Sequence, residues 1–303
     1  MKDLYQLTGI SKQAHFKART MQLKQQSIEE QAVMQGLRVR ADHPAMGCRK
    51  IHQLLGEDAP TGRDRFECFL LENGFRVRFP RNYVKTTRSL KDRYFNNLVS
   101  GKKLNGINQV WQSDIAYIHV GGRFYYLVFI LDVYSRRILG YQVHSHMLAL
   151  ANIKAFKQAL RIRGADCLPE LIHHSDRGSQ YIDKDYLKLQ RAYQVTPSMG
   201  KYCWENAYAE RINGIIKNEY LLKRNLRSFD KLQKELRRSV TLYNEERPHN
   251  SLPNKLPPLS YEKALEAGTI KPKEMIIYDS ELSTIMTVIN KEKRSKKERL
   301  HHQ

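Results

Sequence analysis

The stretch Leu171–Tyr181, which reads LIHHSDRGSQY, decides the fold expected for this chain. Its apolar beginning ends abruptly in Asp176, and Gly178 provides a turn before a new segment opens at Tyr181. A buried strand has this pattern when it delivers a carboxylate to the edge of a sheet, where ligands and metal ions bind. The stretch therefore predicts an α/β domain with an acidic site at the end of one strand.

Two more acids lie in segments that read as regular structure. Asp114 falls inside the expected strand 111–118, WQSDIAYI, at a position that structural proteins usually fill with an apolar or β-branched residue. Glu210 lies in 206–214, NAYAERING, which reads as a helix. A two-metal phosphoryl-transfer site requires several acids from separate elements of one domain. Asp114, Asp176 and Glu210 are therefore the predicted metal ligands and catalytic residues.

These segments resemble the catalytic part of bacterial transposases of the insertion-sequence-three family and of their retroviral integrase relatives. The resemblance covers about residues 20–265 and rests on four motifs: W-x-S-D-I-x-Y-I, L-D-x-x-S-R-x-I-x-G (131–140), H-H-S-D-R-G-S-Q-Y and N-A-x-x-E-R-x-N-G-x-I-K. It implies a ribonuclease H-like mixed sheet with flanking helices, preceded by a small helical DNA-binding region. It also implies DNA cleavage at the ends of an insertion element and joining to target DNA, with two Mg²⁺ or Mn²⁺ ions.

The resemblance implies partners as well. These are the terminal inverted repeats and target DNA, further copies of the chain assembled on DNA, and the product of an upstream reading frame. Two other functions stay open: a ribonuclease H-like nuclease or resolvase that cuts without joining, and an inactive DNA-binding relic of a transposase. The intact set of three acids argues against the relic.

Polar residues beside the acids are candidates for holding DNA. Arg177 and Gln180 follow Asp176 closely and are placed to touch a phosphate or a flanking base. Trp111 and Trp204 are expected to be core or packing residues rather than platforms on which bases stack.

One face of the expected helix carries several polar residues. Asn206, Asn213 and Lys217 fall on the face of Glu210 at helical spacing, so all three are predicted to contact DNA. Gly214 costs about 1 kcal/mol in a helix interior. Either a nucleic-acid backbone approaches there, or the helix packs closely against the sheet.

The third acid has a rival in Glu205, which stands where the family usually has Asp. The 33 residues from 177 to 209 are two fewer than the family commonly has between its second and third acids. Glu205 is the weaker candidate because it lies more than one helical turn from Glu210 and its side chain points in a different direction. His173 and His174 alternate across a strand, so they can shape a pocket but not share a zinc ion.

The charge of the chain points to a polyanionic partner. Its 52 basic and 31 acidic residues give a net charge of +21, which favours binding to phosphates with release of their counterions. Residues 1–105 hold 20 basic and 10 acidic residues, 106–220 hold 14 and 10, and 221–303 hold 18 and 11. The acid-bearing part is thus the least basic, as expected for an enzyme that holds metal with acids and DNA with their surroundings.

Other features of the sequence indicate the cellular compartment. The four cysteines form no C-x-x-C pair, no apolar run approaches a membrane span, and the first ten residues lack the apolar core of a secretion signal. With 41% hydrophobic residues the chain reads as globular. A bacterial cytoplasmic protein in contact with the nucleoid is expected.

Residue patterns divide the chain into five parts. The pieces around Thr8–Ser11 predict a helix-turn-helix or a helical hairpin. The expected parts are 1–20 (helix-turn-helix), 21–80 (small helical domain), 81–106 (basic connector), 107–225 (catalytic core) and 226–303 (helices and basic tail). The expected strands are 110–120, 124–131, 137–143, 170–175 and a short one ending at Thr196, and the main expected helices are 28–39, 62–73, 149–163, 183–192 and 229–243.

Overall fold

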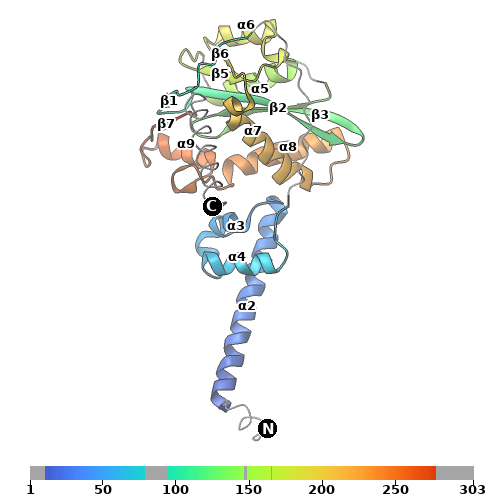
Figure 1. Cartoon of the computed structure of the whole chain (residues 1–303), viewed down its shortest axis with the longest axis vertical. Coiled ribbons are helices and arrows are strands. Elements are labelled where there is room, and N and C mark those ends of the chain that lie inside the picture. Colours follow the sequence, from blue (N-terminus) through green and yellow to red (C-terminus); the bar gives the residue numbers. More distant parts are fainter. Residues whose placement is uncertain (1–10, 79–93, 147–148, 165, 278–303) are drawn as a thin grey trace, which may run out of the picture. The chain divides into compact units, whose positions relative to one another are not determined.

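The computed structural model describes residues 11–78, 94–146, 149–164 and 166–277 (Figure 1). The chain divides into two compact units, residues 1–81 and 82–303. The first piece of the expected helix-turn-helix, the first half of the basic connector and the basic tail lie outside the described residues, so they stay predictions.

Three helices build the first unit: α2 (Lys12–Asp42), α3 (Cys48–Leu55) and α4 (Arg63–Glu72). A short 3₁₀ turn, η1 (Gly56–Asp58), follows α3. The side chains between the helices form one apolar core made of Ala32, Met46, Cys48, Ile51, Phe66, Phe69, Leu70 and Phe75. Helices α2 and α4 include or coincide closely with the helices 28–39 and 62–73 that the sequence predicts.

Helix α2 differs from the expectation that the helix after Ser11 and the helix 28–39 are separate. Ser11 caps it as predicted, since its Oγ accepts a hydrogen bond from the Ala14 N–H at 3.1 Å. The helix then continues without a break to Asp42, across the boundary expected near residue 20. No proline and only one glycine, Gly36, lie in this range, so nothing stops the helix. Residues 12–27 are exposed, which explains why they lack an apolar period.

A five-stranded mixed sheet forms the centre of the second unit (Figure 1). Its strands are β2 (Val110–Val120), β3 (Arg123–Asp132), β4 (Ile138–His144), β5 (Ile172–Ser175) and β6 (Thr196–Met199). They lie in the order β4-β3-β2-β5-β6, in which β2, β3 and β4 are antiparallel and β5 and β6 run parallel to β2. This is the ribonuclease H-like mixed sheet that the sequence predicts, so the fold class is confirmed.

Helices cover both faces of the sheet. On one face, α5 (Ala149–Arg163) and α6 (Lys184–Ala192) pack over Trp111, Val128 and Ile130. Helix α5 approaches β4 so closely that a Cβ on Gly140 would lie 2.0 Å from the carbonyl oxygen of Ala155.

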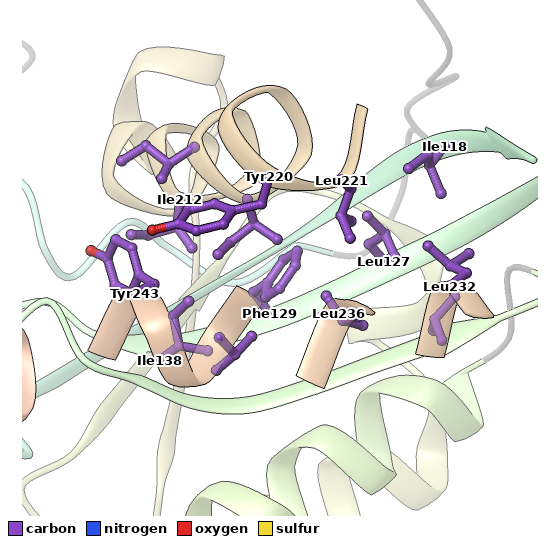
Figure 2. Close-up of a cluster of buried hydrophobic side chains, with 14 of the residues drawn as sticks. Ile118, Leu127, Phe129, Ile138, Ile212, Tyr220, Leu221, Leu232, Leu236 and Tyr243 are labelled. Atoms are coloured by element: carbon purple, nitrogen blue, oxygen red, sulfur yellow. The ribbon is translucent and has the colours of Figure 1, made fainter. Parts of the chain in front are cut away.

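The opposite face carries the helix with the third acid. It is covered by α7 (Ala207–Gly214), the π-helical η4 (Ile215–Tyr220) and α8 (Phe229–Glu245). Figure 2 shows how Phe129 and Leu127 of β3 meet side chains of these helices in the larger core. Smaller turns link the elements: η2 (Ser179–Tyr181), η3 (Cys203–Asn206), η5 (Leu221–Lys223) and η6 (Pro253–Lys255). The second half of the acid-bearing helix is therefore wound more widely than the regular α-helix expected.

Strand β6 begins at Thr196, where the sequence predicts the strand to end. Pro197 lies inside β6, opposite His173 of β5. Proline removes one ladder hydrogen bond and is tolerated at the edge of a sheet, which is the position of β6. The expectation that the strand ends before the proline is wrong for that reason.

The motif at 131–140 connects the sheet to the C-terminal part of the unit, which holds α9 (Pro258–Glu266) and a small sheet of β1 (Lys103–Leu104) and β7 (Met275–Ile276). Arg163 bridges Asp132 at 3.1 Å and Glu262 of α9 at 2.7 Å, and all three are buried or nearly so. The motif therefore acts in the fold, by docking α9. Across the described ranges, no helix is long and apolar enough to cross a membrane.

Candidate active site

Asp114 and Asp176 lie side by side because of the strand register. Strands β2 and β5 are parallel neighbours, with Ser113 opposite Ser175. Asp114 and Asp176 are the next residues on each chain, and neighbouring strands lie about 4.8 Å apart. Both side chains are partly buried. The sheet thus brings together the two acids that the sequence assigns to separate strands.

The turn after β5 shapes the surroundings of Asp176. Its Oδ1 accepts a hydrogen bond from the Gly178 N–H at 3.1 Å. A Cβ on Gly178 would lie 2.8 Å from Gln180 Nε2 and 3.1 Å from the same Asp176 Oδ1. Only glycine fits here without moving the carboxylate.

Helix α7 is fastened to β2 on both sides of Glu210. Asn206 Nδ2 donates to the Ser113 carbonyl at 2.9 Å, and Asn213 Nδ2 donates to Asp114 Oδ2 at 2.7 Å. Glu210 lies between these two anchors on an exposed position of α7. The third acid is therefore presented next to Asp114 by hydrogen bonds that hold the helix in place.

The three carboxyl groups influence one another electrostatically. Burial, followed by repulsion from Asp176 and Glu210, raises the pKa of Asp114 to about 8. Burial and the charge of Asp176 also raise the pKa of Glu210, and burial raises the pKa of Asp176. Within the described part of the chain, no three His, Cys, Asp or Glu side chains are grouped closely enough to hold a metal ion. The charges of the acids thus affect the pKa values of Asp114 and Glu210, but the three side chains are not close enough together to enclose an ion.

Glu205 has a different task from that of the three acids. Its Oε2 accepts hydrogen bonds from the N–H groups of Lys201 and, at 2.8 Å, of Tyr202. Its Oε1 accepts from Asn97 Nδ2 at 3.0 Å. Because these donors already engage the carboxylate, Glu205 shapes the loop before α7, and the geometry favours Glu210 as the third acid.

Asn206 and Asn213 do not agree with the expectation that they contact DNA. Both are buried, and each amide is bound to β2 as described. The sequence pattern places them correctly on the face of Glu210, but that face meets the sheet at these two positions. They position α7 and Asp114 instead.

The other three residues expected to contact DNA differ in how exposed their side chains are. Gln180 is buried, and its Oε1 accepts a hydrogen bond from Ser179 Oγ at 3.3 Å. Arg177 is partly buried, with its guanidinium 4.1 Å from the ring centre of Tyr94. Lys217 is also partly exposed, and burial lowers its pKa. Arg177 and Lys217 remain the predicted DNA contacts with an accessible charge.

Sequence reasoning misses Gln112, which is fully buried next to the site. Its Oε1 accepts from the Ala209 N–H at 3.3 Å, and its Nε2 donates to the Glu205 carbonyl at 3.4 Å. It therefore ties β2 to α7 and to the loop before α7. A polar amide inside an otherwise apolar strand is the signal that could have revealed it.

The two histidines point to opposite faces of β5, as predicted. His173 lies within 3.2 Å of the Tyr186 hydroxyl, and His174 Nδ1 lies 2.9 Å from Ser198 Oγ. Burial lowers their pKa values to about 3 and about 4, respectively. Both imidazoles are thus neutral near pH 7 and serve packing around the site.

The two tryptophans behave differently from each other. Trp111 is fully buried against Phe156, with ring centres 5.8 Å apart, as expected. Trp204 is 46% exposed and stacks on Tyr202, with ring centres 4.4 Å apart and an interplanar angle of 10°. Of the two roles expected for it, Trp204 is thus a packing residue at the surface and not a core residue.

Comparison with known proteins identifies the family of this chain. The integrase core domain family matches residues 105–202 and 193–258. An uncharacterized 31 kDa protein of insertion element IS600 from Shigella sonnei is 33% identical over 227 residues, which are 72% of this chain and 81% of that protein. The transposase for IS629 from the same species is 29% identical over 235 residues, 75% of this chain and 77% of the relative. The chain belongs to the IS3 family of insertion-sequence transposases.

Other relatives match shorter parts of the transposase chain. A Mycobacterium tuberculosis protein named for insertion sequence IS986/IS6110 is 33% identical over 171 residues, 54% of this chain. The match spans 61% of that protein, less than two thirds of its length. Among solved structures, the catalytic core of the HTLV-2 integrase in complex with magnesium is 20% identical, with a TM-score of 0.41, over 55% of this chain and 99% of that chain. A likeness of this size says nothing about individual side chains.

Proposed function

We propose that this member of the family is an active DDE transposase, which cuts DNA at the ends of its element and joins the freed 3′ ends to target DNA. The observation that supports this most is the placement of Asp114 and Asp176 side by side, with Glu210 on a helix that is fastened to Ser113 and to Asp114 itself. Each of the three carboxyl groups has a raised pKa. Such uncompensated acids are typical of a functional site.

The donor chemistry of these acids fits two Mg²⁺ or Mn²⁺ ions. Carboxylate oxygens are ligands that these hard cations prefer, and Asp114, Asp176 and Glu210 would hold them after drawing closer together around the ions. When bound, such ions lower the pKa of the attacking hydroxyl group and neutralise charge that develops on the phosphate oxygens. The raised pKa of Asp114 means that this carboxyl has to lose its proton before it can act as a ligand.

Residues of the chain itself orient the reacting groups. Asn213 holds one oxygen of Asp114 at 2.7 Å and so fixes the orientation of this carboxyl group. Lys217, one turn further along, provides a partly exposed positive charge for the phosphate next to the scissile one. Arg177 supplies a second positive charge just past Asp176.

The partners follow from the same proposal. The net charge of +21 supports binding to the inverted repeats of the element and to target DNA. Pairing of two element ends calls for several copies of the chain, and a product of the upstream reading frame is a further proposed partner. The bacterial cytoplasm, at the nucleoid, is the proposed location.

A strand-transfer assay tests the proposal. The full chain is incubated with Mg²⁺, DNA that carries the inverted repeats flanking its gene, and a target plasmid. We expect 3′ ends of the element DNA to become joined to the plasmid. Cleavage without joined products would favour the nuclease or resolvase, and binding without either would favour the inactive relic.

A further inference from the structure

We propose that the stacked rings of Tyr202 and Trp204 form a platform for an unpaired base of the DNA next to the scissile phosphodiester. This inference rests on the proposed function, since it gives the same site a second contact with its substrate. It identifies the kind of nucleotide that the site holds, namely one that has left the double helix.

The exposure of the two rings is the first observation. Tyr202 is 45% exposed and Trp204 is 46% exposed, although their rings stack on each other almost in parallel. Large aromatic side chains usually bury most of their area, so an open flat face of this size is available to a planar ligand. Lys201 adds a positive charge, with its Nζ 5.1 Å from the ring centre of Tyr202.

The loop that carries the rings is firmly held. The carboxylate of Glu205 binds the backbone N–H groups of Lys201 and Tyr202 and the side chain of Asn97. At the start of the loop, a Cβ on Gly200 would lie 3.0 Å from Glu205 Cβ and 3.2 Å from His174 Nε2. The loop therefore packs tightly against β5, and the platform needs little ordering when a base arrives.

The platform also lies close to the acids. Asn206, which donates to the carbonyl of Ser113 at 2.9 Å, is two residues after Trp204. Two residues span at most about 7 Å of chain, and Ser113 directly precedes Asp114. A nucleotide adjacent to a phosphodiester at Asp114 is thus within reach of the rings.

The chemistry of the platform favours an unpaired base. A base inside a duplex already stacks on its neighbours, so an aromatic platform gains most from a base that has left the helix. Stacking of this kind tolerates every base, because each has a flat π-face. The positive charge of Lys201 suits the phosphate that accompanies the base.

The experiment measures binding in EDTA, so that no strand is cut or joined. Three probes share one duplex: a blunt form, a form with a short single-stranded thymidine overhang, and a form whose overhang is abasic. The chain has two tryptophans, and Trp111 is fully buried, so fluorescence quenching by DNA reports on Trp204. We expect the thymidine overhang to quench the fluorescence and the abasic overhang to leave it nearly unchanged.

Substitutions complete the test. Trp204→Ala should weaken binding of the thymidine overhang at least about fivefold and leave blunt duplex binding unchanged. Trp204→Phe should keep affinity for the overhang within about twofold, because it keeps a ring. Phe124→Ala, at a ring that is 63% exposed on the distant β2–β3 hairpin, is the control and should change nothing.

Two results would overturn the platform. One is equal affinity of the parent chain and Trp204→Ala for the thymidine overhang. The other is a Trp204→Ala variant whose oligomeric state changes in sedimentation while its DNA affinity does not, since the rings would then form a protein interface. Failure of the strand-transfer assay alone would overturn only the proposed function, because the binding experiment needs no catalysis.

Discussion

Asp114 lies among acids, and the charges that raise the pKa of its carboxyl are those of Asp176 and Glu210. Burial is the larger cause of the shift to about 8, and these two charges add to it. The hydrogen bond from Asn213 offsets only part of this effect. A divalent cation would reverse the balance, because it favours the ionised carboxylates.

The raised pKa leads to a prediction about stability and pH. A carboxyl whose pKa is raised by folding binds its proton more tightly in the folded than in the unfolded chain, where the value is about 4. The folded chain therefore loses stability as the pH rises from about 4 to about 8. Asp114→Asn removes this loss, so in EDTA the melting temperature of the variant should exceed that of the parent more at about pH 9 than at about pH 5.

Thermal unfolding followed by circular dichroism measures the difference. Mg²⁺ should reduce the difference in melting temperature between the variant and the parent at high pH, because an ion that binds only the folded parent stabilises it. A gap of equal size at both pH values would show that Asp114 does not titrate in this range.

Lys217 is the second residue whose role can be measured. Its charge is partly buried and is expected to hold the phosphate beside the scissile one. Lys217→Ala should weaken DNA binding and slow joining without changing the requirement for metal. Lys263→Ala, at an exposed position of α9, is the matched control. Joining within twofold of the parent at limiting DNA would mean that Lys217 is an ordinary surface lysine.

Residue identities could be predicted from the sequence better than residue contacts. Asp114 is recognisable because it lies inside a strand pattern, where an apolar side chain is usual. Asp176 is recognisable because it ends an apolar run just before a glycine turn. Whether Asn213 faces DNA or the sheet depends on the rotation of α7, which only tertiary packing sets. The same holds for Trp204, whose exposure depends on the conformation of the loop that Glu205 binds.

At the scale of elements, periodicity is most informative where it is regular. The expected strand 110–120 and helix 149–163 coincide with β2 and α5, because each has an uninterrupted pattern of apolar residues. Periodicity fails for β6, where an edge position tolerates Pro197, and for α2, whose first half packs against nothing described. Burial creates the pattern, so exposed or edge elements are the hardest to predict.

Gly140 and Gly214 differ in whether close packing around them leaves room for a side chain. Gly140→Ala would place a Cβ against the Ala155 carbonyl, so it should lower the free energy of unfolding by about 1–3 kcal/mol or more. Gly214→Ala would meet only Asn218 Nδ2, at 3.9 Å, so close packing against the sheet does not explain this glycine. We expect Gly214→Ala to raise the free energy of unfolding by about 1 kcal/mol. Denaturant titration measures both, and a loss of stability in Gly214→Ala would contradict the account.

At the scale of the whole molecule, the exposed basic residues of α2 and the three acids of the candidate site lie in different parts of the chain. The exposed first half of α2 carries Lys12, Lys17, Arg19 and Lys24. None of these side chains has an ion pair among the described residues. They are available for phosphates of DNA, whereas the acids of the second unit are available for metal ions.

Removing the charge of α2 tests this division. Changing the four exposed basic residues of its first half to Gln in the full chain should weaken binding to element ends. The slope of log affinity against log salt should fall by up to about 0.9 for each phosphate that the variant no longer neutralises. Circular dichroism controls for retention of the helix. An unchanged slope would place the electrostatic binding of DNA outside α2.

The central claim is that Asp114, Asp176 and Glu210 form one metal site. The most direct measurement is electron paramagnetic resonance of Mn²⁺ bound to the full chain with element-end DNA. Asp114→Asn, Asp176→Asn and Glu210→Gln are compared with the parent and with Glu170→Gln, an exposed acid outside the site. We expect bound Mn²⁺ to fall sharply in the first three variants and to be unchanged in the control. Binding at the parent level in all three would contradict the central claim.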